Sequence, residues 1–190
     1  LVSQAIGARS PAEANRLARQ TVLWGFLLSI PLAVLGYALA PGIVGLFHTE
    51  PDVAREAVTY LRITGGTIVA LLMTFVCGAV LRGAGDSQTP LRTSIIANAI
   101  NVFLAWAMIF GNAGFPRMEV AGSAWSTAIG RAVGASILVW LLFSGRRAVS
   151  LAGREGWTLR LGTARELMRL GVPAAIEQML MSAGFTVMIA

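Results

Sequence analysis

The sequence has little charge, no lysine, and only one cysteine and one histidine. Of its 190 residues 13% are charged and 56% are hydrophobic, and the mean hydropathy is +0.71. A soluble globule of this size needs more polar surface than this composition supplies. Cys77 has no second cysteine to pair with, so an internal disulfide is excluded. We therefore predict an integral membrane protein.

The sequence also lacks the motifs of enzymes and metal proteins. It contains no His, Cys and acidic residues at metal-ligand spacing, no Ser/His/Asp arrangement and no glycine-rich phosphate loop. We expect no enzymatic activity, no metal and no cofactor. The net charge of +6 comes from arginines beside apolar runs and not from a basic patch interleaved with aromatics. That pattern predicts no nucleic-acid partner.

Long apolar runs predict an all-α, polytopic transmembrane helix bundle. A helix rises about 1.5 Å per residue and a bilayer core is roughly 30 Å thick, so about 20 residues cross it. The chain contains about four such spans plus the start of a fifth, which ends inside an apolar run at Ala190. We therefore expect a part of a longer protein. The predicted full spans are 21–47, 57–81, 93–116 and 120–143.

The segment 81–111 contains the tightest connection, where a polar turn ends one span and starts the next. Its glycines supply turn conformations, Thr89 is predicted to cap the next helix, and Pro90 fits the first helical position. Two capping-box patterns predict further helix starts. They are Ser10 to Glu13 and Thr163 to Glu166, the latter starting the last helix near Ala164.

Arginine counts predict the orientation. Segments 1–20, 82–92 and 144–169 hold three, two and six arginines, whereas 48–56 and 112–119 hold one each. The positive-inside rule therefore predicts that the first three segments are cytoplasmic and that the other two face outward.

Two asparagines lie deep in the predicted third span. Asn98 and Asn101 are three residues apart and so share one helix face. They either line a polar cavity or join helices by hydrogen bonds. In the fourth span, small residues indicate close helix packing, and Thr127 is a further candidate to present its hydroxyl to a cavity.

Two charged residues also lie inside predicted spans. Arg131 is near the middle of the fourth span, where it either pairs with a group of the bundle or faces an aqueous cavity. Glu177 follows Pro173 by four residues, about one turn into the last span. It is either a carboxylate that binds a coupling ion or an interfacial acid.

Several segments together resemble the multidrug and toxic compound extrusion (MATE) family of antiporters. Their order and spacing run along nearly the whole chain. The matching pieces are VSQAIGA at 2–8, TYLRI at 59–63, LRGAGDSQTPL at 81–91, NAINV at 98–102, FGNAGFPRMEVAGSAWST at 110–127 and GVPAAIEQ at 171–178.

The resemblance implies twelve helices in two six-helix lobes that open alternately. Such proteins export cationic amphipathic compounds against entry of Na⁺ or H⁺. Residues 1–143 would then belong to the first lobe (the loop after helix 2, and helices 3 to 6), 144–169 to a cytoplasmic inter-lobe linker, and 170–190 to the start of helix 7. It further implies a bacterial inner membrane location, contact with membrane lipid, small cationic molecules as substrates, and a monomer.

The resemblance also implies roles for individual residues. Asn101 matches the asparagine of the family's N-x-x-x-D pattern, but Ala105 stands in place of the aspartate. Thr127 matches the threonine of a G-x-A-x-x-T pattern that lines the first-lobe cavity. Glu177 falls in a helix where some members keep a cation-binding carboxylate. Two rivals remain: a flippase for lipid-linked saccharides or lipids, which Arg131 favours, and a membrane scaffold subunit without a transport path.

Overall fold

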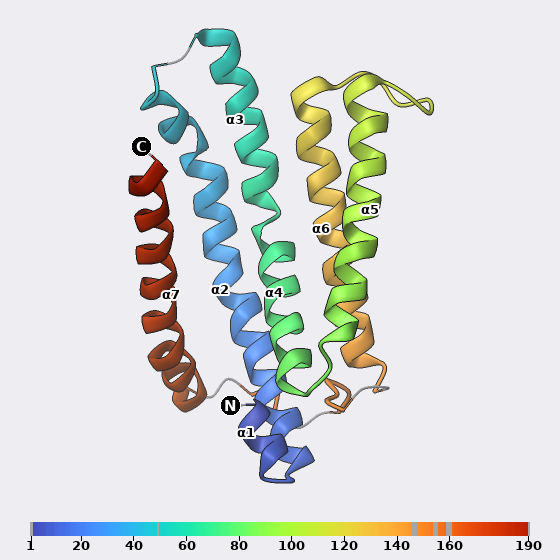
Figure 1. Cartoon of the computed structure of the whole chain (residues 1–190), viewed down its shortest axis with the longest axis vertical. Coiled ribbons are helices and arrows are strands. Elements are labelled where there is room, and N and C mark those ends of the chain that lie inside the picture. Colours follow the sequence, from blue (N-terminus) through green and yellow to red (C-terminus); the bar gives the residue numbers. More distant parts are fainter. Residues whose placement is uncertain (1, 49, 146–147, 154–155, 159–160, 190) are drawn as a thin grey trace.

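The computed structural model describes residues 2–48, 50–145, 148–153, 156–158 and 161–189, and within them it contains seven helices and no strand (Figure 1). The predicted all-α fold is confirmed. The helices are α1 (Val2–Gly7), α2 (Pro11–Gly45), α3 (Pro51–Gly66), α4 (Ile68–Gly83), α5 (Gln88–Phe110), α6 (Glu119–Phe143) and α7 (Leu161–Ile189).

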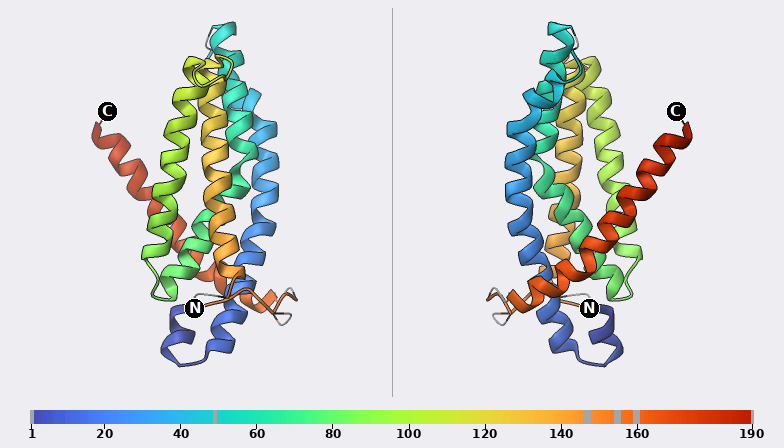
Figure 2. Two further views of the ribbon diagram at one scale, coloured as in Figure 1. Left: turned by 90° about the vertical axis from the view of Figure 1, so that its right-hand side faces the viewer. Right: turned by 90° about the vertical axis from the view of Figure 1, so that its left-hand side faces the viewer.

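The long helices run side by side, with α1 below the lower end of the bundle (Figure 1). α5 packs along α6, α2 packs on α3 and α4, and α6 also contacts α3 and α4. α7 contacts α2 and diverges from the bundle toward its C-terminal end (Figure 2). The three arginine-rich segments lie at one end and the two arginine-poor connections at the other (Figure 1).

Among the described residues, three helices, α2, α5 and α6, are long and apolar enough to cross a membrane, and α3 with α4 makes a fourth span if the pair counts as one. The predicted span 57–81 is not one continuous helix, because the chain bends by 41° between α3 and α4. Gly65, the last residue but one of α3, lies against α2, where a Cβ atom would lie 2.9 Å from the carbonyl carbon of Gly36. The break therefore accompanies a close backbone contact between α2 and α3.

The start of α5 differs from the prediction. Asp86, and not Thr89, is the capping side chain: its carboxylate accepts the Thr89 amide at 2.9 Å and the Thr89 hydroxyl at 2.6 Å. The helix begins at Gln88, so Pro90 is its third residue. Thr89 does not cap because the helix already begins one residue before it, and its hydroxyl donates to the Asp86 carboxylate instead.

Neither predicted capping box forms. Ser10 makes no side-chain bond to the helix, and Glu13 pairs instead with Arg16 at 3.6 Å. Pro11 nevertheless occupies the first helical position, as predicted. α7 begins at Leu161, so Thr163 and Glu166 lie within the helix and not at its start.

The core lies at the lower end of the bundle and includes part of the predicted linker. Val149 and Leu151 are fully buried beside Leu142, and the Leu151 amide donates to the Leu142 carbonyl at 2.9 Å. By contrast, large apolar side chains are exposed along the outside of the spans, as on a lipid-facing surface. Examples are Leu39, 53% exposed, and Val102, 67% exposed.

Buried polar side chains of α2 hold this linker segment. Arg19 donates to the Leu151 carbonyl at 3.2 Å and also to the Ala152 carbonyl. Gln20 donates to the Thr158 carbonyl at 2.6 Å. Each of these donors satisfies a linker carbonyl that has no helix to pair with.

Candidate functional site

A cavity of about 400 Å³ opens between α4, α5 and α6, near the middle of α5 and α6. Among the residues that the structure describes, no aspartate or glutamate lines it. Its polar lining consists of hydroxyls, two amides and one guanidinium, and the rest is apolar or glycine. The lining residues are Leu71, Thr74, Phe75, Thr93, Ser94, Ala97, Asn98, Asn101, Thr127, Gly130, Arg131 and Gly134.

Asn98 and Asn101 both face this cavity, as their spacing on α5 predicts. The Asn101 amide nitrogen donates to the Thr127 hydroxyl oxygen at 3.4 Å, which is a long and weak bond. The Thr127 hydroxyl in turn donates to the Ser123 carbonyl at 2.9 Å. Asn101 thus combines both predicted roles, lining the cavity and joining α5 to α6, whereas the exposed Asn98 only lines it.

The small residues of α6 bring α5 close enough for this contact. A Cβ atom at Gly122 would lie 2.8 Å from the Met108 carbonyl carbon, and one at Gly130 would lie 3.0 Å from the Asn101 Cβ. Both distances are below ordinary van der Waals contact, so glycine is required for the present helix separation. The packing interpretation of the small residues in this span is therefore supported.

Arg131 lies near the centre of α6, is half-buried and lines the same cavity. Within the part of the chain that the structure describes, its guanidinium has no hydrogen bond or ion pair. Of the two alternatives, the geometry therefore favours the one in which Arg131 faces an open cavity. An unpaired charge at this depth of a span is costly, about 2.5 to 3.5 kcal/mol on insertion scales.

Glu177 is not part of this site. It is an exposed residue of α7, a helix whose contacts with the other helices, among the described residues, are with α2. The structure thus brings together four of the five candidate residues and leaves Glu177 apart from them.

Three further polar residues line the cavity and escaped the sequence argument: Thr74, Thr93 and Ser94. Ser94 precedes Asn98 by four residues and Asn101 by seven, which is the spacing of one helix face. That signal was available in the sequence. Thr74 lies on another span, and nothing in the sequence fixes the rotation of α4 relative to α5.

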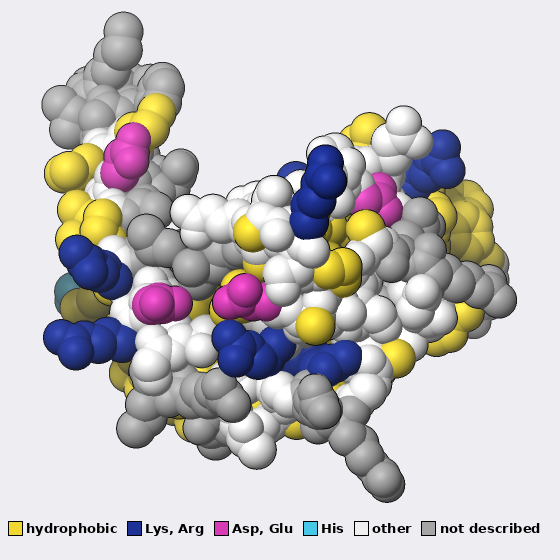
Figure 3. All heavy atoms as spheres, turned by 90° about the horizontal axis from the view of Figure 1, so that it is seen from below, with side chains coloured by type: hydrophobic (Ala, Val, Ile, Leu, Met, Phe, Trp, Pro, Cys, Tyr) yellow, Lys and Arg dark blue, Asp and Glu magenta, His cyan; other side chains and the backbone are white. Residues whose placement is uncertain are grey.

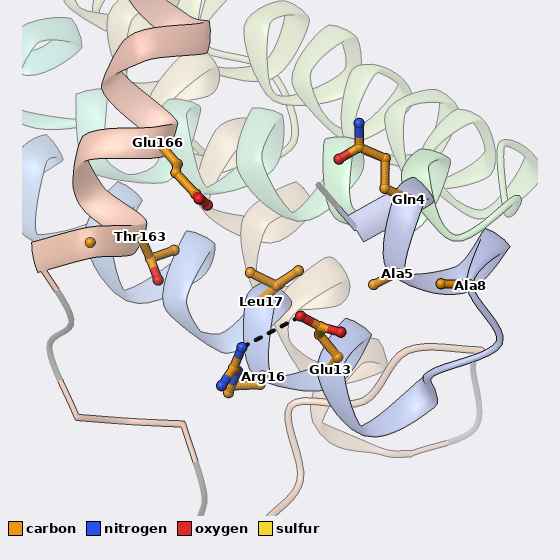
Figure 4. Close-up of a pocket in the computed structure, with 9 residues that line it drawn as sticks. Gln4, Ala5, Ala8, Glu13, Arg16, Leu17, Thr163 and Glu166 are labelled. Atoms are coloured by element: carbon orange, nitrogen blue, oxygen red, sulfur yellow. Dashed lines mark ion pairs between the residues drawn. The ribbon is translucent and has the colours of Figure 1, made fainter.

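A second cavity, of about 660 Å³, lies at the base between α1, α2 and α7 (Figure 4). Glu13 and Arg16 form an ion pair on one side of it, and Glu166 of α7 extends toward it from the other. Both basic and acidic side chains are present across this end of the molecule (Figure 3). The cavity is larger than the one between α4, α5 and α6. However, it lies at the end of the bundle that is predicted to meet the membrane–water interface, where water readily solvates charged groups.

Comparison with known proteins gives consistent results. A family model described as MatE matches residues 1–107. "Probable multidrug resistance protein NorM" of Thermotoga maritima is 34% identical over 195 residues, covering 96% of this chain and 39% of that protein. "Probable multidrug resistance protein YoeA" of Bacillus subtilis is 33% identical over 186 residues, covering 96% and 40%. The chain thus spans about 40% of the length of the curated relatives that it matches.

Solved structures share the fold. A crystal structure of MATE in the bent conformation superposes with a TM-score of 0.86 at 18% identity, covering 97% of this chain and 40% of that one. An inward-facing MATE family transporter gives a TM-score of 0.84 at 18% identity, covering 96% and 40%. At this level of identity the likeness describes the fold alone.

Proposed function

Because the chain belongs to the MatE family of multidrug and toxic compound extrusion transporters, we propose that it forms part of the first lobe of a secondary active multidrug efflux antiporter. The family is one of transporters and not of enzymes, and the chain is a multi-pass membrane protein. In this proposal residues 144–169 connect the two lobes, and 170–190 begin the second lobe. The organisms of the relatives support a bacterial inner membrane location.

The observation that carries the proposal is the cavity between α4, α5 and α6. Four polar side chains chosen from the sequence for their depth in a span, Asn98, Asn101, Thr127 and Arg131, line it together. Polar groups at this depth are costly unless they face protein or water, so a shared water-accessible cavity explains all four at once. In alternating access, such a cavity opens to one side of the membrane and then to the other.

The proposed antiporter exports cationic amphipathic compounds in exchange for Na⁺ or H⁺, acts as a monomer and contacts membrane lipid. No carboxylate lines the described cavity, and Ala105 occupies the position of the family's aspartate. The described part of this lobe therefore lacks the aspartate that the family's pattern would supply for coupling. Glu177, exposed on α7, is the candidate for an ion-binding carboxylate of the second lobe.

The test is efflux of a cationic dye from proteoliposomes of the whole transporter under an imposed sodium or proton gradient. We expect Asn101→Ala to reduce efflux, and Glu177→Gln to abolish its dependence on the gradient. Matched controls are Asn112→Ala, in the α5–α6 connection, and Glu119→Gln, whose carboxylate pairs with Arg117 on the surface at 3.2 Å. Absence of gradient-dependent dye movement in the wild type would refute the antiporter.

One observation favours a second function, a flippase for lipid-linked saccharides or lipids of the same superfamily. Arg131 gives the cavity a positive charge, which suits a phosphate-bearing lipid better than a cationic drug. Movement of a labelled lipid between leaflets by the purified protein, without any ion gradient, would support this alternative.

The non-transporting scaffold makes a different prediction, namely that the polar side chains are sealed from water. Cysteine substitution at Asn98, Asn101 and Arg131 followed by labelling with a water-soluble thiol reagent tests it. The native Cys77 is fully buried, so background labelling is expected to be low. Labelling at none of the three positions would exclude a transport path through this lobe.

A further inference from the structure

The cavity between α4, α5 and α6 carries charge of one sign, which is positive. Arg131 is the one charged residue among the described residues that line it. Its guanidinium makes no ion pair or hydrogen bond within the described chain. A lone cation in a low-dielectric site attracts an anion far more strongly than it would in water.

The neutral polar groups around Arg131 do not offset this charge. The Thr74 hydroxyl donates to the Ala70 carbonyl at 2.9 Å, and the Thr127 hydroxyl donates to Ser123. Asn98 is exposed and lines the cavity, and among the described residues no hydrogen bond donated by its side-chain amide is found. The cavity thus offers a guanidinium and an amide donor, but no carboxylate to receive a cation.

The geometry of the cavity suits one end of an amphipathic molecule. Its volume of about 400 Å³ falls at the lower end of the range for small-molecule sites. Leu71 and Phe75 form an apolar wall on α4. α5 and α6 are in close contact beside it, since a Cβ atom at Gly134 would already lie 3.3 Å from the Ala97 Cβ. Arg131 and the apolar wall therefore line the same cavity.

We infer that this cavity is an oxyanion subsite, in which Arg131 binds the carboxylate or phosphate of an amphipathic substrate while Leu71 and Phe75 contact its apolar body. The planar guanidinium fork matches the two oxygens of such a group. The inference rests on the proposed function, because it assumes that the cavity belongs to the substrate path. It changes the substrate class within that function: zwitterionic or anionic amphipaths are preferred over purely cationic ones.

The test uses two dyes that differ only at the oxyanion. Tetramethylrhodamine carries a free carboxylate beside its cationic ring system, and its methyl ester is purely cationic. Binding to the purified whole transporter in detergent is measured by fluorescence anisotropy, so the result does not depend on transport. We expect the wild type to bind the carboxylate dye about tenfold or more tightly than the ester, as for one charge-assisted contact.

Three variants assign the preference to Arg131. Arg131→Gln should abolish the preference by weakening the binding of the carboxylate dye alone. Arg131→Lys should retain part of the preference. The control Arg92→Gln removes an exposed arginine of α5, bonded to Gln88 at 3.3 Å, and should bind both dyes as the wild type does. Arg131-dependent displacement of the dye by phosphatidic acid in mixed micelles would identify a lipid headgroup as the source of the oxyanion.

The outcomes separate this inference from the proposed function. Equal binding of the two dyes, or no binding of either, would overturn the oxyanion subsite. If Arg131→Gln weakens the binding of both dyes and lowers the unfolding temperature, Arg131 has a structural role and the inference is wrong. Arg131-dependent binding of the carboxylate dye without any gradient-driven efflux would leave the subsite standing and refute the antiporter.

Discussion

Replacing Arg19 by methionine tests the contact that joins α2 to the segment after α6. Arg19 is 7% exposed, and its guanidinium donates to the carbonyls of Leu151 and Ala152. Methionine preserves much of the apolar stem and removes the donors. The expected result is that residues 148–153 separate from α2 while the transmembrane helices stay folded.

The magnitude follows from the contacts that are lost. A hydrogen bond to a charged group contributes about 1.5 to 3 kcal/mol, so two such bonds amount to about 3 to 6 kcal/mol. Two effects reduce this value: the exposed Ala152 carbonyl can turn to water, and the buried charge no longer has to be desolvated. We expect a net loss of about 2 kcal/mol, which corresponds to about a 30-fold change in an opening equilibrium.

Amide hydrogen exchange of the purified protein measures this opening. The Leu151 amide donates to the Leu142 carbonyl at 2.9 Å and exchanges when the segment separates. Its exchange should accelerate about 30-fold in Arg19→Met and stay unchanged in Arg92→Met, which removes an exposed arginine of α5. Unchanged exchange at Leu151 in Arg19→Met, or equal acceleration throughout α5, would refute the view that Arg19 holds this segment locally to α2.

Two further changes test how the helices pack and begin. Gly122→Ala should lower the unfolding temperature in detergent, because the new Cβ would lie 2.8 Å from the Met108 carbonyl and overpacking costs about 1 to 3 kcal/mol. Gly42→Ala, whose Cβ would meet nothing within 4 Å, should not lower it, and equal effects would contradict the packing argument. Asp86→Ala should destabilise by about 1 kcal/mol through loss of the cap on Thr89, and Asp86→Asn by less, in the same unfolding assay. Identical unfolding temperatures for the two Asp86 variants would rule out the cap.

The spans were predictable because membrane insertion depends on a local property, the hydropathy of about 20 consecutive residues. The helix containing Arg131 was predicted to within one residue, at 120–143 against Glu119–Phe143. The bend between α3 and α4 was not predicted, because it accompanies contact of Gly65 with Gly36, 29 positions earlier in the sequence. Hydropathy contains no information about such a contact.

The site was partly predictable for the same reason. The rule that polar groups inside a span need polar surroundings selected five residues, of which Asn98, Asn101, Thr127 and Arg131 share one cavity, whereas Glu177 lies apart from it on α7. The rule cannot specify which spans face each other, so Thr74 of α4 was missed. Their role in transport remains a prediction.

The predicted linker shows a different limit of sequence reasoning. Its six arginines predicted a cytoplasmic connection, and nothing in the sequence analysis indicated that Val149 and Leu151 of this segment are fully buried in the core. The stabilising partner, Arg19, lies 132 residues from Leu151 and was counted only as a topological charge. Moving this segment would expose two apolar side chains and remove two carbonyl acceptors from a buried guanidinium. If two lobes rotate against each other as proposed, the chain must therefore bend beyond Thr158, whose carbonyl Gln20 still holds to α2.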